Sequence, residues 1–121
     1  MRFRQLAGSR WVRILFWLAA LLAFLLAVNP HPPHYPGEPS DKVQHMIAFA
    51  TLGVLGAAAY PKTSIWRLLA WLSAFGAAIE LVQAIPVLHR DSDIMDWATD
   101  TVAAGVVLLC IAWQRAASRL D

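Results

Sequence analysis

Polar and charged residues interrupt the apolar C-terminal half of this chain in one stretch, from Glu80 to Asp100 (ELVQAIPVLHRDSDIMDWATD). Three of its acids, Glu80, Asp96 and Asp100, lie beside or within long apolar segments. An aspartate near the centre of a lipid bilayer costs roughly 2.5 to 3.5 kcal/mol on insertion scales, and less near an interface. A chain that keeps several such groups is expected to use them, so the stretch predicts a binding or reaction site.

Helical spacing favours convergence of these polar groups. Residues three or four apart lie on one face of a helix. The sets with this spacing are Asp41 with His45, Glu80 with Gln83, and the series Asp93, Asp96 and Asp100. Carboxylates beside an arginine, a lysine and a histidine suit a ligand with hydroxyl, amide or ammonium groups. The predicted ligand-binding set is Asp41, Lys42, His45, Glu80, Gln83, Arg90, Asp96 and Asp100.

The same residue types also suit a divalent metal, or acid and base catalysis on a phosphate or glycosidic linkage. We assign no catalytic residue, because the chain carries no recognised phosphatase or metal-binding motif. His45 is the one histidine of this set, which is fewer than most zinc sites use. We therefore predict neither a metal nor another cofactor.

A purely structural role is the alternative for some of these side chains. Capping would explain Asp93, and Asp41 with Gln44 has the arrangement of a capping box, with Ser40 as an alternative cap. Capping does not explain Glu80, which is expected near a helix C-terminus, where the macrodipole disfavours negative charge. The structural alternative also stays open for Lys42 and Trp97 as interfacial residues, His45 as a core histidine and Gln83 as a link between helices.

Composition indicates a membrane protein. The chain has 121 residues, 59% hydrophobic and 15% charged, with a mean hydropathy of +0.52. Soluble domains carry about 25% charged residues, so this composition favours a bundle of transmembrane helices. A net charge of +2 with scattered basic residues argues against nucleic acid as a partner. The single cysteine, Cys110, excludes an intrachain disulfide and is expected to pack as a small apolar residue.

The predicted fold is all-α, with four transmembrane helices. Residues 1–13 form a basic cytoplasmic N-terminus, 14–28 an uncleaved first span and 29–40 a proline-rich extracytoplasmic loop. Residues 41–108 form the core, with the second span at about 43–60, the third at about 65–87 and the fourth from about 94 to near 114. Residues 115–121 are the cytoplasmic tail. Gly53, Gly56 and Ala57 give the second span a small-residue face for helix contact.

Orientation follows from the basic residues. Of ten lysines and arginines, only Lys42 and Arg90 lie outside the N-terminus, the turn from Lys62 to Arg67 and the C-terminal tail. By the positive-inside rule, both termini are cytoplasmic. The starts of the second and fourth spans and the end of the third then reach the outer face of a bacterial inner membrane, where the candidate residues form one layer.

The order of the polar blocks resembles that of the VanZ-like family of small bacterial membrane proteins. The blocks that carry the resemblance are Asp41-Lys42-x-x-His45-x-x-Ala48-Phe49, Glu80-x-x-Gln83, and Arg90-x-Ser92 followed by Asp96. They lie within 41–107, which includes three of the four predicted spans. Two positions depart from the family pattern, which usually has asparagine in place of Asp100 and commonly glycine in place of Ala103. The first change adds an acid and would alter ligand preference or proton coupling.

The resemblance implies a role at the cell envelope. The founding member is associated with resistance to the glycopeptide teicoplanin, and relatives occur near genes of envelope and polysaccharide metabolism, but the family has no agreed biochemical activity. We expect an outer-leaflet pocket that binds a membrane lipid or a lipid-linked envelope precursor, in a monomer or a homo-oligomer. The alternatives are a metal-dependent hydrolase or transferase acting on an envelope lipid or glycan, a proton-linked carrier, and a purely structural subunit.

Overall fold

The computed structural model describes residues 6–29, 36–38, 40–86 and 93–119. This part of the chain is helical, without strands, and its long helices are α2 (Arg10–Val28), α3 (Asp41–Ala59), α4 (Ile65–Gln83) and α5 (Ile94–Arg119). All four are long and apolar enough to cross a membrane, which confirms the predicted all-α class with four candidate spans. α2, α3 and α4 have 19 residues each, or about 28 Å of helix, close to the roughly 30 Å hydrocarbon core of a bilayer.

Short polar side chains begin the helices. The hydroxyls of Ser9, Ser40 and Ser64 accept hydrogen bonds from the N–H groups three residues on, at 3.3, 3.3 and 3.2 Å. Of the two predicted caps for α3, Ser40 is the one observed, while Asp41 is already the first residue of the helix. The predicted cap of α5 is confirmed, because Asp93 Oδ1 accepts a hydrogen bond from the Met95 N–H at 2.9 Å.

Two helix ends differ from the predicted ends of the spans. α4 ends at Gln83, before the predicted limit near 87, and Pro86 lies shortly after it, where proline favours a helix stop. α5 continues to Arg119, beyond the predicted limit near 114. The sequence after 114 contains alanines and no proline or glycine, so nothing in it interrupts the helix.

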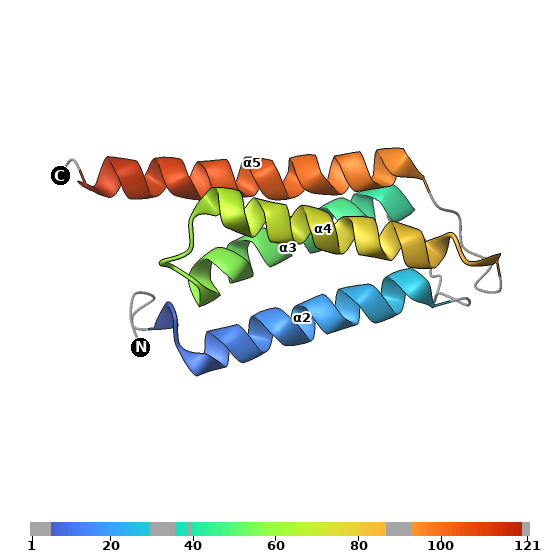
Figure 1. Ribbon diagram of the computed structural model, residues 1–121, viewed down its shortest axis with the longest axis horizontal. Helices are drawn as coiled ribbons and strands as arrows, with labels where there is room; N and C mark the ends of the chain where they lie inside the picture. Colours follow the sequence, from blue (N-terminus) through green and yellow to red (C-terminus); the bar gives the residue numbers. More distant parts are fainter. Residues whose placement is uncertain (1–5, 30–35, 39, 87–92, 120–121) are drawn as a thin grey trace.

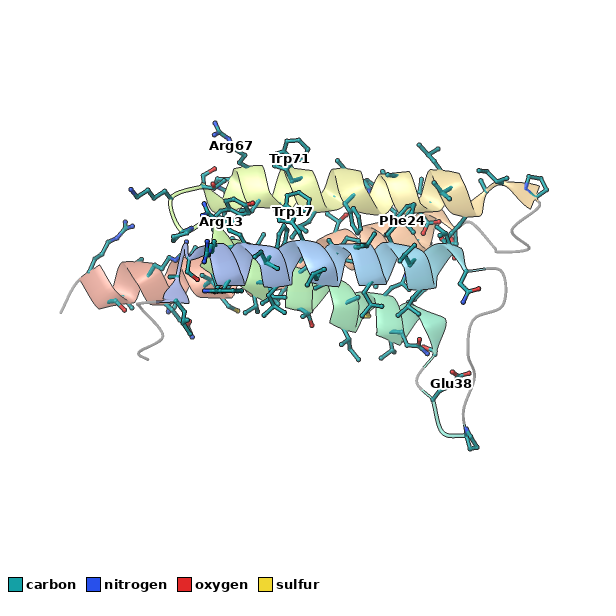
Figure 2. All side chains as sticks on the ribbon, turned by 90° about the horizontal axis from the view of Figure 1, so that it is seen from below. Arg13, Trp17, Phe24, Glu38, Arg67 and Trp71 are labelled. Carbon is teal, nitrogen blue, oxygen red and sulfur yellow. The ribbon has the colours of Figure 1, made fainter. Side chains whose placement is uncertain are left out.

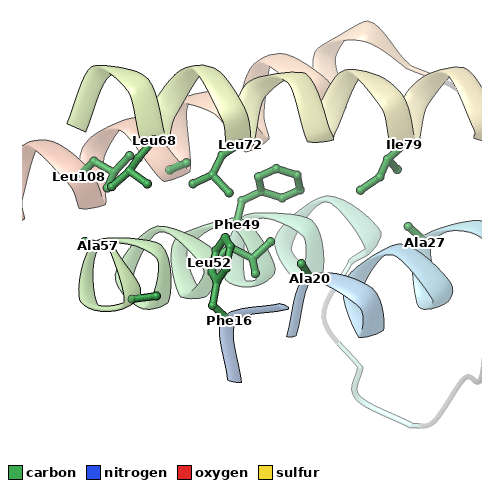
Figure 3. Packing of buried hydrophobic residues seen from close by; sticks show 12 residues of the cluster. Phe16, Ala20, Ala27, Phe49, Leu52, Ala57, Leu68, Leu72, Ile79 and Leu108 are labelled. Carbon is green, nitrogen blue, oxygen red and sulfur yellow. The ribbon is translucent and has the colours of Figure 1, made fainter. Parts of the chain in front are cut away.

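α3 is central to the bundle. It packs most extensively against α5 and also contacts α2 and α4. α3 and α5 run in the same direction, and α2 and α4 run in the opposite one (Figure 1). Figure 3 shows the buried Phe49 and Leu52 of α3 facing Leu72 and Ile79 of α4. This apolar core occupies the middle of the bundle, so polar side chains gather towards its ends.

Glycines let α3 approach its neighbours closely. A Cβ added to Gly53 would lie 3.3 Å from Val107 Cγ1 of α5, and one added to Gly56 would lie 3.2 Å from the Phe16 ring of α2. The predicted small-residue face is therefore confirmed, and its two glycines face two different helices.

The start of α2 and the end of α5, the helices nearest the two chain termini, lie at the same end of the bundle (Figure 1). The turn between α3 and α4 lies there too. Exposed tryptophans lie towards this end: Trp11 and Trp66 are near the starts of α2 and α4, and Trp113 is in the last third of α5. Tryptophan is enriched where a membrane meets water. The opposite end holds the start of α3, the end of α4 and the start of α5.

Replacing Gly53 with leucine tests the close contact between α3 and α5. We expect Gly53→Leu to lower the free energy of unfolding by about 1 to 3 kcal/mol, because the added atoms overlap Val107. Thermal unfolding of the detergent-solubilised protein measures the change. Ala70→Leu, on an exposed part of α4, is the matched control, and equal effects of the two substitutions would contradict this packing.

Candidate functional site

The described candidate residues converge at the end of the bundle opposite the termini. They come from the start of α3, the last turns of α4 and the first two turns of α5. We call this group the polar layer, and its members are Lys42, His45, Glu80, Gln83, Asp96 and Asp100. The side chain of Asp41 and the whole of Arg90 lie outside the described residues, so their predicted places in the site stay predictions.

Two contacts join α3 to α5 across the layer. Lys42 Nζ lies 3.7 Å from Asp96 Oδ1, and His45 Nδ1 lies 3.6 Å from Asp100 Oδ2. The steps of three residues on α3 and four on α5 match because the two helices run in the same direction in register. Both distances are ion-pair distances and too long for hydrogen bonds.

Exposure falls steadily from the first contact to the second. The side chains of Lys42 and Asp96 are 48% and 17% exposed, and those of His45 and Asp100 are 12% and 2% exposed. Lys42 and Asp96 therefore form the rim of the layer, and Asp100 forms its base. A polar group that approaches from the rim meets Asp96 first and then the imidazole of His45.

Glu80 and Gln83 bind backbone groups at the ends of helices. Glu80 Oε2 accepts a hydrogen bond of 2.8 Å from the Asp93 N–H, just before α5 begins. Gln83 Nε2 donates a hydrogen bond of 2.9 Å to the carbonyl oxygen of Ala27, in the last turn of α2. The last carbonyls of a helix have no partner within it. These two side chains thus attach α4 to its neighbours, which gives both of them a structural role.

Asp100 differs from Glu80 and Gln83, each of which makes a hydrogen bond through one of its side-chain atoms. Its carboxylate is buried, and neither oxygen accepts a hydrogen bond within the described part of the chain. A buried polar group without a hydrogen bond costs about 1 to 3 kcal/mol, and a charged one costs more. His45 at 3.6 Å offsets only part of this cost. Asp100 is the residue of the layer that the fold explains least.

An apolar groove runs beside the polar layer, between α3 and α5. It has a volume of about 390 Å³, and its lining includes Met46, Met95, Thr99, Val102 and Val106. Met46, Met95 and Thr99 are the chain neighbours of His45, Asp96 and Asp100. From Met95 to Val106 the groove follows about three turns of α5, roughly 16 Å. The polar layer and this apolar groove therefore lie side by side.

A second polar link, between α4 and α5, was not anticipated from the sequence. The hydroxyls of Ser73 and Thr101 lie 3.0 Å apart, and Trp97 Nε1 donates a 3.0 Å hydrogen bond to the Ser73 carbonyl. Trp97 is thus half-buried between helices instead of being a simple interfacial residue. The sequence gives no signal for this link. A threonine in a helix usually donates to a carbonyl of its own helix, as Thr51 and Thr99 do here, so Thr101 could not be assigned a partner on α4.

Comparisons with protein-family models, with curated proteins and with solved structures gave no match. Among the described residues, no group of three or more histidine, cysteine, aspartate or glutamate side chains is placed to hold a metal ion.

Asp100→Asn tests whether the acid is kept at a cost to stability. We expect the substitution to raise the unfolding temperature of the purified protein, because it removes a buried charge that no described donor satisfies. Asp96→Asn is the control, and it should change the free energy of unfolding by less than about 1 kcal/mol, because its ion pair with Lys42 is partly exposed. A marked fall in stability for Asp100→Asn would instead assign the carboxylate a structural role.

Proposed function

We infer that this chain is a VanZ-like, multi-pass protein of the bacterial inner membrane, with both termini in the cytoplasm. The described basic residues at the end of the bundle that carries the termini support this orientation: Arg10, Arg13, Lys62, Arg67, Arg115 and Arg119. The opposite end carries Lys42 and the described acids. In this orientation the polar layer faces the outside of the cell.

The proposed function is to bind a membrane lipid or lipid-linked envelope precursor, in cell-envelope homeostasis or in glycopeptide resistance of the teicoplanin type. One observation carries the proposal: the unsatisfied, buried carboxylate of Asp100, next to His45 and reached from the rim at Asp96. Hydroxyl, amide or ammonium groups of a ligand would supply the donors that this carboxylate lacks. The headgroup would occupy the polar layer.

The groove between α3 and α5 supports a lipid in preference to a soluble ligand. It begins beside the polar layer and is lined mainly by methionine, alanine and valine. Methionine side chains adapt to irregular apolar shapes. A lipid whose headgroup reaches His45 would therefore lay its tail along Met46, Val102 and Val106.

Native mass spectrometry with phosphatidylethanolamine, whose headgroup carries an ammonium, tests this function. We expect the wild-type protein to retain the lipid and Asp100→Asn to weaken retention by about ten- to a hundredfold, the effect of one hydrogen bond to a charged group. Val102→Trp, which fills the groove, should also weaken it. A polyprenyl-linked sugar, tested in parallel, represents the envelope precursors.

Thr101→Val is the matched control for the lipid experiment. Thr101 is next to Asp100 but pairs with Ser73 on α4, so its loss should leave lipid retention unchanged. Equal retention by the wild type and Asp100→Asn, with both proteins folded, would refute binding at the polar layer.

Hydrolysis is a second candidate function, favoured by the orientation of His45. Its Nδ1 lies 3.6 Å from the Asp100 carboxylate, and catalytic hydrogen bonds that are long in a free enzyme tighten when the substrate binds. The shortened contact would orient the ring for proton transfer at Nε2. Water deprotonated in this way would attack phosphorus in a phosphate ester, and the phosphorus–oxygen bond to the leaving group would break. Asp100 would then act as the positioning residue for His45.

Phosphate release from a polyprenyl diphosphate distinguishes turnover from binding. If the site is hydrolytic, wild-type protein releases phosphate and His45→Gln reduces the rate by about a hundredfold or more, the usual contribution of a general base. If the wild-type protein retains the lipid but releases no phosphate, hydrolysis is refuted and binding remains the proposed function.

A further inference from the structure

A second, larger cavity lies between α2 and α4, in the half of the bundle nearer the termini. Its volume is about 600 Å³, and its walls include the aromatic rings of Phe16, Trp17, Tyr60, Trp71 and Phe75. Trp17 and Trp71 are 60% and 71% exposed, so the cavity opens on the outer surface of the bundle. In a membrane this surface faces lipid.

α2 and α4 contact each other on the side of the cavity nearer the polar layer. Gln83 donates to the carbonyl of Ala27, and the ring of Phe24 lies 6.5 Å from that of Phe75, which also lines the cavity. Nearer the termini, Trp17 Nε1 donates a 2.8 Å hydrogen bond to the hydroxyl of Tyr60, which fixes the indole at the edge of the space. Figure 2 shows Trp17 and Phe24 between the ribbons of the two helices.

Two arginines lie on the side of this cavity nearer the termini. Arg67 belongs to its lining, one helical turn before Trp71, and Arg13 stands one turn before Trp17 on α2. Figure 2 shows both arginines displaced from the tryptophans towards the end that carries the termini. The acids of the described chain lie elsewhere: Glu38 in the segment before α3, and Glu80, Asp93, Asp96 and Asp100 in or beside the polar layer.

We propose that the cavity between α2 and α4 holds an acyl chain of an anionic phospholipid, with the lipid phosphate paired to the guanidinium of Arg67. The aromatic walls suit a hydrocarbon chain, and a guanidinium at the membrane surface binds phosphate through two parallel hydrogen bonds. The volume lies within the roughly 300 to 1,000 Å³ of known ligand pockets. The site would draw its lipid from the leaflet on the side of the termini.

This site is independent of the polar layer. The two sites share no lining or contact residue, and they lie towards opposite ends of the bundle. The part of the preference for an anionic phospholipid that depends on Arg67 should therefore be the same in the Asp100→Asn protein as in the wild type, so the failure of one assignment leaves the other intact.

Native mass spectrometry of the full chain tests the site with phosphatidylglycerol and phosphatidylcholine of identical acyl chains. We expect wild-type protein to retain more phosphatidylglycerol than phosphatidylcholine. Arg67→Gln should reduce the preference roughly fivefold, the effect of one basic residue at a membrane surface. Ala74→Trp, which fills the cavity from an exposed position, should lower the retention of both lipids about tenfold or more, because several methylene groups lose their contacts.

Matched controls separate the site from general effects. Arg119→Gln removes a charge at the same end of the bundle but outside this cavity, and Ala78→Trp adds the same ring at an exposed position beyond the cavity. Both should behave as wild type, and all four variants should keep the wild-type unfolding temperature within a few degrees. Equal retention of the two lipids by the wild type would overturn the pairing with Arg67. Unchanged retention in Ala74→Trp, or an equal loss in Ala78→Trp, would overturn the cavity as the site.

Discussion

The parallel contact between α3 and α5 is the constraint on which the polar layer depends. Gly53 allows the two helices to approach until its backbone lies against Val107 and the carbonyl of Ala104. The register fixed at this contact also sets His45 opposite Asp100. One residue of slip would turn a helix face by about 100°, which would separate the histidine from the carboxylate. Packing in the apolar middle of the bundle therefore determines the chemistry at its end.

The polar residues of the layer divide into those that complete the fold and those that the fold leaves incomplete. Glu80 and Gln83 bond to backbone groups at the ends of α5 and α2, where a helix always has groups without internal partners. Inside a membrane such bonds matter more, because no water replaces them. The Asp100 carboxylate accepts no hydrogen bond from a helix end within the described part of the chain. The proposed ligand, or a proton transfer, would account for the cost of burying this carboxylate.

Helix number, the polar layer and the small-residue face could be predicted from sequence, because apolar length and spacing of three and four residues encode them. The pairing of residues on α3 with residues on α5 within the layer could not be predicted. Spacing showed that Asp96 and Asp100 share a face with Asp93, but the partners on α3 depend on the rotation and register of packed helices, which one sequence does not fix. The link between helices through Gln83 was anticipated, but its partner, the carbonyl of Ala27, was not. The contact of Trp97 with the Ser73 carbonyl was missed altogether, because a backbone carbonyl leaves no signal in the sequence.

The arrangement of the two ends bears on whether a ligand could pass through the protein. Acids and a buried carboxylate lie at one end, and arginines beside an aromatic cavity lie at the other. Between them, Phe49, Leu52, Ile79 and Leu108 form a closely packed, buried core. A proton-linked carrier needs a polar path through this region, and the buried side chains there are apolar. Two separate sites, one for each leaflet, fit this core better than one continuous pathway.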